Sequence, residues 1–418
     1  MRILIFTHNY FPEGNALASR FTAMCQHWVA LGHEVQVITN TPNFPAGQIF
    51  DGYKNKFVQH EIIDGVHVTR VWTYVTPNKG TLKRMVSFIV FMFMAVWIAL
   101  FQKRPDIIIG SSPQFFAAWA GLISSRLHWH RVPFIAEIRD LWPDSIVAVG
   151  AMKNKKLLAI IYWLEKLLYR KATHLVTVGP GYAEDLKDKN VPEEKISIIP
   201  NGVDKELFLD KLPDENFRTK YNLENKTACA YIGTIGMAAG LEIVLNAAEQ
   251  LQKLNRNDII FFLIGEGAER EILQKDAENR QLNNVIFTGM IPKNNVPEIL
   301  AAIDICFVHL KKKPLFTRVL PSKIFEMAAM KKPIILGVEG FAAQLIREAN
   351  AGICIEPENT NNFLEALELL VQQPELRESY GEHGQQYVLK YYNRQHLAEK
   401  YIQVMESIIY SSNNNKHQ

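Results

Sequence analysis

Short runs of aliphatic and β-branched residues alternate with longer amphipathic runs along almost the whole chain. This pattern is typical of a parallel sheet covered on both faces by helices. In the first half we predict strands at 2–7, 34–39, 66–72, 106–110, 134–138, 174–178 and 196–199. In the second half we predict strands at 228–233, 259–264, 285–288, 305–309, 333–337 and 352–355. The chain is therefore predicted to be an α/β protein with two doubly wound domains.

The length supports this division, because 418 residues exceed what one hydrophobic core usually serves. A Pro-Asn-Gly turn at 200–202 follows the last strand of the first series and marks the boundary. We therefore expect an N-terminal domain at 1–200 and a C-terminal domain at 201–386. A final helix is expected at 387–410, crossing back to the first domain, before a disordered polar tail at 411–418.

The cysteines and the N-terminus suggest a cytoplasmic protein. Four cysteines lie far apart, with no Cys-x-x-Cys pair, so we expect reduced buried thiols rather than disulfides or a zinc site. The chain opens directly into an apolar strand and lacks the charged region and cleavage site of a signal peptide.

Charge and hydropathy point to an anionic surface as a partner. Residues 1–200 hold 22 Lys and Arg against 15 Asp and Glu, a net charge of +7. The same half contains an apolar run at 85–101, within a segment 79–104 whose two ends are basic. This run fits a buried helix, a membrane-contacting or re-entrant helix, or a short spanning helix. We expect peripheral association with the inner (plasma) membrane.

Several kinds of chemistry are excluded by missing motifs. The chain lacks the G-x-G-x-x-G signature of dinucleotide-binding folds and the G-x-x-x-x-G-K-[ST] phosphate loop, so we expect neither a hydride-transfer enzyme nor an ATPase, and no cofactor. It also lacks Asp-x-Asp, H-E-x-x-H and G-x-S-x-G. Without Asp-x-Asp a divalent metal has no evident anchor, and we predict no metal site. A bound diphosphate would then be neutralised by backbone N–H groups and basic side chains.

Two loops that contain glycine follow the first strand of each domain. The loop 8–16 includes Gly14 and Asn15, and the loop 233–240 includes Gly233 and Thr234. Each leads into a helix, where backbone can approach a phosphate closely. Their equivalent positions in two domains favour phosphate contact, although glycines also occur in ordinary turns.

The segment 318–326 carries the strongest local signal. Pro321 and Ser322 begin a helix, and Lys323 and Glu326 then share its first turn. A lysine there can meet a diphosphate, and a carboxylate one turn later can accept two ribose hydroxyls. The alternative is an exposed Lys–Glu pair with a small stabilising effect.

A second charged cluster follows the predicted strand 134–138. Asp140 at the end of this strand can orient or deprotonate an acceptor hydroxyl, and Arg139 can stabilise charge on a departing phosphate. A structural ion pair between Arg139 and Asp144 is the alternative.

At these residues the chain resembles glycosyltransferase family 4, retaining enzymes of the GT-B fold, over essentially its whole length. The matching segments are 10–15, Pro200-Asn201-Gly202-Val203-Asp204, Gly233-Thr234-Ile235-Gly236, Ile264-Gly265-Glu266-Gly267, Phe287-Thr288-Gly289 and Pro321-Ser322-Lys323-Ile324-Phe325-Glu326-Met327. The resemblance implies two facing Rossmann-like domains with a cleft between them. It also implies a nucleotide sugar bound mainly by the C-terminal domain.

Three positions depart from the family pattern. Arg318 replaces a usual Glu, Thr234 and Ala239 replace the Arg and Lys of the glycine loop, and Arg139 replaces a usual His. Lys323, with Arg318, is then expected to carry the diphosphate. With these departures the chain resembles a subgroup of the family, the bacterial L-fucosamine transferases of O-antigen and capsule assembly.

That similarity implies transfer of N-acetyl-L-fucosamine from its UDP form to an undecaprenyl diphosphate-linked glycan in lipopolysaccharide or capsule synthesis. Gly265, Ser322 and Glu326 would bind the donor, and backbone at Met290 and Ile291 would pair with the uracil edge. GDP-fucose and UDP-GlcNAc are alternative donors. An enzyme of another class, a UDP-sugar 2-epimerase, shares the fold, and a non-catalytic membrane scaffold is a further alternative. No nucleic acid is expected as a partner.

Overall fold

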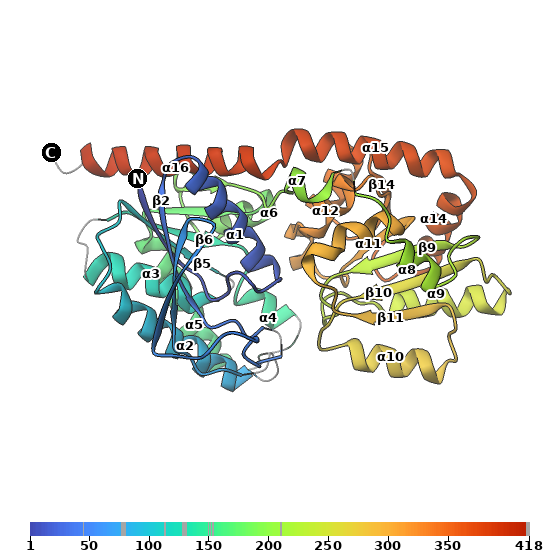
Figure 1. Ribbon diagram of the computed structural model, residues 1–418, viewed down its shortest axis with the longest axis horizontal. Helices are drawn as coiled ribbons and strands as arrows, with labels where there is room; N and C mark the ends of the chain where they lie inside the picture. Colours follow the sequence, from blue (N-terminus) through green and yellow to red (C-terminus); the bar gives the residue numbers. More distant parts are fainter. Residues whose placement is uncertain are drawn as a thin grey trace. The chain divides into compact units, whose positions relative to one another are not determined.

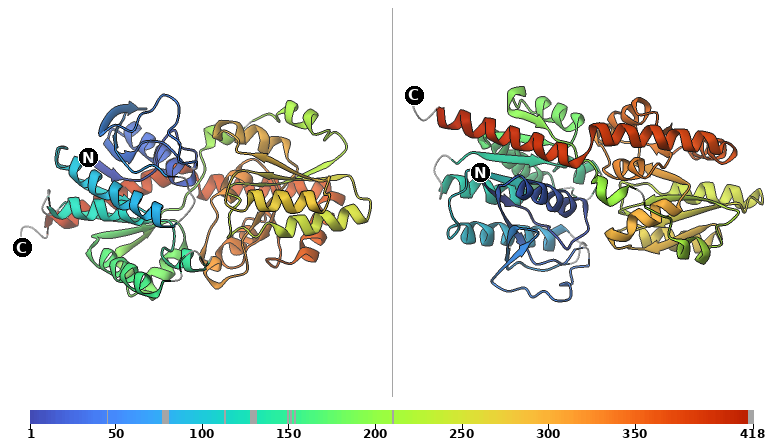
Figure 2. Two further views of the ribbon diagram at one scale, coloured as in Figure 1. Left: turned by 90° about the horizontal axis from the view of Figure 1, so that it is seen from below. Right: turned by 45° about the horizontal axis from the view of Figure 1, so that its top comes forward.

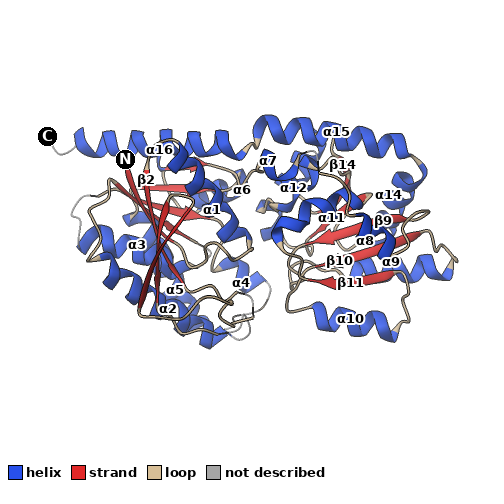
Figure 3. Ribbon diagram, viewed as in Figure 1, coloured by secondary structure: helices blue, strands red, loops and turns tan. Residues whose placement is uncertain are grey.

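The computed structural model describes residues 1–414 except 45, 77–80, 113, 128–131, 149, 151, 153 and 210. The chain forms two compact units. The first unit holds residues 1–201 together with the C-terminal segment from Arg394, and the second unit holds Gly202–Asn393. In each unit a layer of strands lies between helices (Figure 3).

Within the described residues, the first unit contains one eight-stranded sheet in the order β3-β4-β2-β1-β5-β6-β7-β8. Its strands are β1 (Arg2–Phe6), β2 (Glu34–Asn40), β3 (Val58–Ile63), β4 (Val66–Val71), β5 (Ile107–Ser111), β6 (Phe134–Ile138), β7 (His174–Thr177) and β8 (Ile196–Ile198). Neighbouring strands are parallel except for β3, which pairs antiparallel with β4 at the edge.

Side chains alternate between the two faces of this sheet. On β1, Leu4 and Phe6 join one core while Ile3 and Ile5 join the other, as the two-residue repeat of a strand requires. The helices of the unit are α1 (Ala16–Ala30), α2 (Thr81–Ala99), α3 (Phe115–Leu127), α4 (Asp144–Ala148), α5 (Lys155–Lys171), α6 (Pro180–Asp188) and α16 (Arg394–Asn414), with the 3₁₀ turn η1 (Glu193–Lys195). Helices α2, α3 and α5 cover one face, and α1 and α16, which lie beside each other, cover the opposite face (Figure 1).

The second unit contains a six-stranded parallel sheet in the order β11-β10-β9-β12-β13-β14 across its described residues. Its strands are β9 (Thr227–Ile232), β10 (Ile259–Ile264), β11 (Val285–Gly289), β12 (Ile305–His309), β13 (Ile334–Gly337) and β14 (Gly352–Cys354). Its helices are α7 (Lys205–Phe208), α8 (Glu215–Lys220), α9 (Glu242–Lys253), α10 (Arg270–Asn279), α11 (Val296–Ala302), α12 (Lys323–Ala329), α13 (Phe341–Glu348), α14 (Thr360–Gln372) and α15 (Pro374–Tyr391), with 3₁₀ turns η2 (Lys293–Asn295) and η3 (Pro314–Arg318). Helices α9, α10 and α14 cover one face, and α11, α12, α13 and α15 cover the other.

The strand predictions are confirmed within one or two residues at each end, but β3 was missed. Strand β3 lies at the sheet edge and is half exposed, so its sequence lacks a continuous apolar run. The turn that joins it to β4 is Asp64-Gly65, with positive φ at both residues (49° and 80°). An Asp-Gly pair is a recognised hairpin signal, and it was present in the sequence.

The C-terminal helix prediction was wrong in its bounds. Residues 387–391 end α15, and a separate helix α16 begins at Arg394. The tail expected to be disordered from 411 is helical as far as Asn414, and residues 415–418 lie outside the described residues.

The apolar run at 85–101 forms α2 and the turn after it. Phe91, Ala95, Ile98 and Ala99 are buried in the core, and the helix lies against α3 (Figure 2). The outer side of α2 exposes Val86, Phe93 and Trp97, and Phe101 is exposed in the turn after the helix. In the described part of the chain, no helix has the length and hydropathy of a membrane span. The expected flanking residue Lys79 lies outside the described residues.

Candidate active site

Three glycines stand at the carboxyl ends of adjacent strands in the second unit. Gly233, Gly265 and Gly289 follow or end β9, β10 and β11, with φ of 141°, 139° and 77°. The amide of Gly233 donates to the carbonyl of Ile264, and the amide of Gly265 donates to the carbonyl of Gly289, both at 2.9 Å. A Cβ atom on Gly265 would lie 2.0 Å from the carbonyl oxygen of Gly233. The glycines therefore allow three loops to join closely where ligands of doubly wound sheets bind.

Lys323 reaches this group of loops from the first turn of α12. Its Nζ atom lies 3.6 Å from the centre of the Tyr231 ring. A Cβ atom on Gly233 would lie 2.7 Å from the same Nζ atom. The Tyr231 hydroxyl donates to the carbonyl of Thr234 at 2.8 Å, so the ring is fixed to the glycine loop. The lysine, the aromatic ring and the loop form one cluster with a cation–π contact.

The pKa of Lys323 lies well below the ordinary lysine value. Burial lowers the pKa of Lys323 to about 7, and the nearby carboxylate of Glu326 offsets this only in part. Near neutral pH the ammonium form is therefore only partly populated. A bound diphosphate would favour the charged form and raise this pKa.

The remaining predicted residues of the second unit lie close in sequence to Lys323, Gly233 or Gly289. Ser322 precedes α12 without forming a side-chain cap bond, and half-buried Glu326 lies one turn after Lys323. Arg318 ends η3 and is half buried. Exposed Met290 and half-buried Ile291 follow β11, the strand next to β10. Thr234 is exposed in the glycine loop.

The predicted residues of the first unit support the start of α1. Asn15 is its N-cap, accepting a hydrogen bond from the amide of Ala18 at 2.9 Å. The Arg139 guanidinium donates to the carbonyls of Ala16 (2.6 Å) and Leu17 (3.1 Å). Gly14 is exposed just before this cap. The structure thus brings Gly14, Asn15 and Arg139 together around one loop.

Arg139 does not form the alternative ion pair with Asp144, which instead pairs with Lys189 at 2.8 Å. Burial lowers the pKa of Arg139 to about 9, and Glu137, whose Oε1 lies 3.8 Å from Arg139 Nε, opposes this shift. Its side chain is only 5% exposed. In this structure the Arg139 guanidinium therefore holds backbone carbonyls of α1, and its contact with a phosphate stays a prediction.

Asp140 retains a side chain suited to proton chemistry. Its carboxylate accepts a hydrogen bond from the Ser145 hydroxyl at 3.0 Å and is partly exposed. Burial raises the pKa of Asp140, and the Ser145 bond opposes this shift. A raised pKa brings a carboxylate closer to the range useful for general base catalysis.

Two residues that the sequence analysis missed hold the loop 8–15. The buried Glu13 carboxylate accepts hydrogen bonds from the amides of Asn43 and Phe44, both at 2.9 Å. The buried Arg70 guanidinium donates to the carbonyls of Phe11 and Asn40. Both residues are polar and distant in sequence from their partners, so no local pattern signals them.

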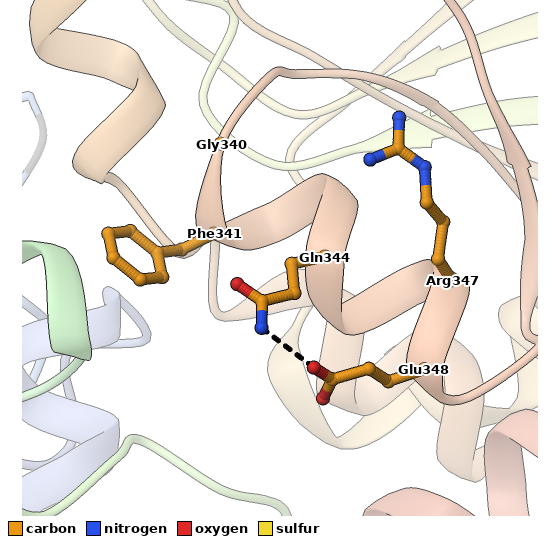
Figure 4. Close-up of a pocket in the computed structure, with 5 residues that line it drawn as sticks. All are labelled: Gly340, Phe341, Gln344, Arg347 and Glu348. Atoms are coloured by element: carbon orange, nitrogen blue, oxygen red, sulfur yellow. Dashed lines mark hydrogen bonds between the residues drawn. The ribbon is translucent and has the colours of Figure 1, made fainter.

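A surface hollow of about 440 Å³ lies beside α13, lined by Gly340, Phe341, Gln344, Arg347 and Glu348 (Figure 4). Gln344 donates to Glu348 across one turn at 2.7 Å. This hollow contains none of the predicted residues, and we place the candidate site at the glycine loops instead. The described residues contain no group of three or more His, Cys, Asp or Glu side chains arranged to hold a metal.

The architecture is that of GT-B glycosyltransferases. Sucrose-phosphate synthase from Thermosynechococcus elongatus matches with a TM-score of 0.76 at 16% identity, covering 98% of this chain and 99% of that chain. WaaG, a glycosyltransferase involved in lipopolysaccharide biosynthesis, matches with a TM-score of 0.69 at 17% identity, covering 97% and 99%. These similarities establish the fold.

Family models identify the chain more closely. Residues 213–407 match glycosyl transferases group 1, and residues 15–202 match a glycosyl transferase 4-like domain. WcaI of Escherichia coli (strain K12), named for colanic acid biosynthesis, is 26% identical over 96% of this chain and 99% of its own. The O-antigen chain mannosyltransferase C of Escherichia coli is 22% identical over 64% and 71%. The two models together cover most of the chain, which belongs to the group 1 glycosyltransferases, family 4.

Proposed function

We propose that this glycosyltransferase moves a sugar from a UDP donor to a lipid-linked glycan during synthesis of a surface polysaccharide. The observation that carries the proposal is the placement of Lys323 against Tyr231 and Gly233 at the carboxyl end of the second sheet. Related structures of Anabaena HepE contain UDP or UDP-glucose, which supports a UDP donor. The names of WcaI and of the O-antigen mannosyltransferase support a role in surface polysaccharides.

In this proposal the second unit holds the donor. Lys323, with Arg318 and Ser322 close by in the chain, neutralises the diphosphate together with backbone at Gly233, Thr234 and Gly265. Glu326 accepts the ribose hydroxyls, and backbone at Met290 and Ile291 pairs with the uracil edge. From the first unit, Gly14 and Asn15 are proposed as further donor-binding residues.

The proposed reaction retains configuration at the anomeric carbon. The bond from that carbon to the diphosphate breaks, and its electron pair leaves with the diphosphate. The acceptor oxygen bonds to the same face of the sugar, and its proton passes to a donor phosphate oxygen, with Asp140 orienting the acceptor hydroxyl. Lys323 stabilises the charge that develops on the diphosphate, which makes electrostatics the main contribution of the protein.

The acceptor is proposed to be an undecaprenyl diphosphate-linked glycan at the cytoplasmic face of the inner membrane. Helix α2 supports this because its exposed side carries Phe93 and Trp97, 65% and 53% exposed. Lys83 and Arg84 are exposed at its start, and Lys103 is exposed just after its end. Helix α5 adds exposed Ile160 and Trp163 on the same face of the sheet. Aromatic residues flanked by basic ones suit an anionic lipid surface.

For the donor sugar we propose N-acetyl-L-fucosamine. The support is the combination of Arg318, Thr234 and Arg139, which resembles the L-fucosamine transferases. UDP-GlcNAc and GDP-fucose are the alternative donors that the transfer assay has to exclude.

The test is a transfer assay with a panel of UDP- and GDP-sugars and a polyprenyl diphosphate-linked glycan in vesicles, with EDTA present. We expect product from UDP-N-acetyl-L-fucosamine alone. Product from GDP-fucose only would overturn the UDP assignment, and product from UDP-GlcNAc only would overturn the sugar assignment. Equal transfer to a free, water-soluble glycan would overturn the lipid-linked acceptor.

A further inference from the structure

A buried histidine ends β12, directly beside the glycine loop. The side chain of His309 is 1% exposed. Its Nδ1 atom lies 2.6 Å from the carbonyl oxygen of Ala239, and its Nε2 atom lies 2.8 Å from the amide nitrogen of Glu358. A carbonyl can only accept and an amide N–H can only donate, so Nδ1 carries the proton and Nε2 accepts. Both partners are satisfied only by the neutral imidazole in this tautomer.

The surroundings leave room for this ring in one position. A Cβ atom on Gly337 would lie 2.3 Å from His309 Cδ2. A Cβ atom on Gly240, where φ is +59°, would lie 3.2 Å from His309 Cε1. The Phe307 ring stacks on the imidazole, with centroids 5.5 Å apart. Two glycines and one aromatic ring therefore fix the orientation of the imidazole.

Ala239, whose carbonyl accepts the hydrogen bond from His309, lies in the second half of the glycine loop 233–240. The first half is held separately, because the amide of Ile235 donates to Glu266 and the carbonyl of Ile235 accepts from Glu269, both at 3.0 Å. The second half receives hydrogen bonds from His309 and from the amide of Lys311, which donates to Ala238 at 2.9 Å. His309 is thus a side-chain anchor for the half of the loop that leads into α9.

Charged groups around the ring act in both directions on its pKa. Burial lowers the pKa of His309 and keeps it neutral, and Lys311 acts in the same direction. The hydrogen bond to Ala239 and the carboxylates of Glu358 and Glu242 oppose this shift. The neutral form agrees with the hydrogen-bond geometry.

We propose that His309 is a positioning residue for the donor, fixing the second half of the glycine loop so that its backbone N–H groups are preorganised for the nucleoside diphosphate. This inference rests on the proposed function of that loop. His309 touches no substrate in this account and acts through Ala239. Preorganised donors bind a charged group without the cost of ordering the loop at the moment of binding.

The geometry supplies matched variants. In His309→Asn the side-chain amide can replace Nδ1–H and keep the bond to Ala239, while the acceptor for Glu358 is lost. In His309→Gln the side-chain oxygen can replace Nε2 and keep the bond from Glu358, while the bond to the loop is lost. If His309 only stabilised the fold, the two variants would not differ in UDP affinity or in loop exchange.

The experiment measures UDP affinity by calorimetry and amide hydrogen exchange in residues 236–240 without ligand, with melting temperatures as the folding control. We expect His309→Gln to weaken UDP binding about tenfold, the loss of roughly one hydrogen bond, and to speed exchange in the loop. His309→Asn should stay within about threefold of wild type in both measurements. KM for the donor should rise more than kcat falls.

Equal UDP affinity in wild type and His309→Gln, or equal losses in both variants, would overturn the positioning role. If His309→Gln does not fold, His309→Phe, which keeps the stacked ring and removes both hydrogen bonds, takes its place with the same expectation. If the wild-type protein binds no UDP, the proposed function fails and the positioning role fails with it. Wild-type UDP binding that is unchanged in the variant overturns only the positioning role.

Discussion

The ammonium group of Lys323 lies 3.6 Å from the centre of the Tyr231 ring, beside the backbone of Gly233. The Tyr231 hydroxyl donates a hydrogen bond to the carbonyl of Thr234 in the glycine loop, so the ring orients the lysine toward that loop. This contact offers the half-buried ammonium group only a weak partner compared with an anion. A bound diphosphate would supply the stronger partner. The pH dependence of UDP binding and the effect of the Lys323 charge on stability follow from this difference.

The affinity for UDP should depend on pH through Lys323. The pKa of Lys323 is about 7 in the free protein, and a bound diphosphate raises it. Binding above pH 7 therefore takes up a proton, and we expect the Kd for UDP to increase severalfold to about tenfold per pH unit between pH 7 and 9. Calorimetry in buffers of different ionisation enthalpy measures the proton uptake directly. Lys323→Met should bind UDP weakly and without this uptake; an unchanged proton count in the variant would contradict the assignment.

Removing the lysine charge should stabilise the free protein. The folded-state pKa of Lys323 is lowered, so the unfolded chain binds more protons and the charge destabilises the fold. The destabilisation is complete below about pH 7 and disappears as the pH approaches the ordinary lysine value near 10.4. We expect Lys323→Met to raise the melting temperature at pH 6.5, with a smaller difference at pH 9. A lower melting temperature at pH 6.5 would show that the ammonium stabilises the empty site.

Glu326 should contribute to donor affinity through the ribose. Loss of a hydrogen bond to a charged acceptor costs about 1.5–3 kcal/mol, so Glu326→Ala should raise the KM for the donor roughly tenfold or more. The isosteric Glu326→Gln should lose less, because an amide oxygen still accepts. Steady-state kinetics with 2′-deoxy donor provide the control. If removing the 2′-hydroxyl weakens donor affinity by the same factor in Glu326→Ala as in wild type, Glu326 does not contact that hydroxyl.

Membrane association should depend on the outer side of α2. Replacing both Phe93 and Trp97 by Ser removes two aromatic side chains that are 65% and 53% exposed. We expect binding to anionic vesicles to fall roughly tenfold or more, because each buried aromatic contributes up to a few kcal/mol. Ile62→Ser, at a residue 68% exposed on β3, is the matched control. Equal sedimentation of the double variant and the control with vesicles would contradict a membrane role for α2.

The sequence predicted most of the fold because burial on both faces of each sheet leaves continuous apolar runs. Strand β10, with all six residues buried, is an example. Strand β3 escaped prediction because its middle residues Gln59, His60 and Glu61 are polar and none of its residues is buried at the sheet edge. The break between α15 and α16 was missed because only residues 392–393 separate the two helices.

The candidate site was predicted less completely. The pattern at 321–326 located Lys323 and Glu326 because both fall in one short segment of fixed helical geometry. Tyr231, Glu13 and His309 act through contacts that join distant parts of the chain, and no local spacing signals such contacts. Arg139 was placed at the correct strand end, but its partners, the carbonyls of Ala16 and Leu17, depend on how α1 packs.

The turnover of Lys323→Met in the presence of EDTA tests the central claim most directly. Transfer from the UDP-sugar to the lipid-linked acceptor is compared with wild type and with Lys313→Met, an exposed lysine upstream of the same helix. Loss of one preorganised transition-state contact should lower kcat roughly 10²–10³-fold in Lys323→Met and leave Lys313→Met near wild type. Wild-type turnover should survive chelation. Near-normal turnover of Lys323→Met, or loss of wild-type activity in EDTA, would contradict a diphosphate neutralised by this lysine.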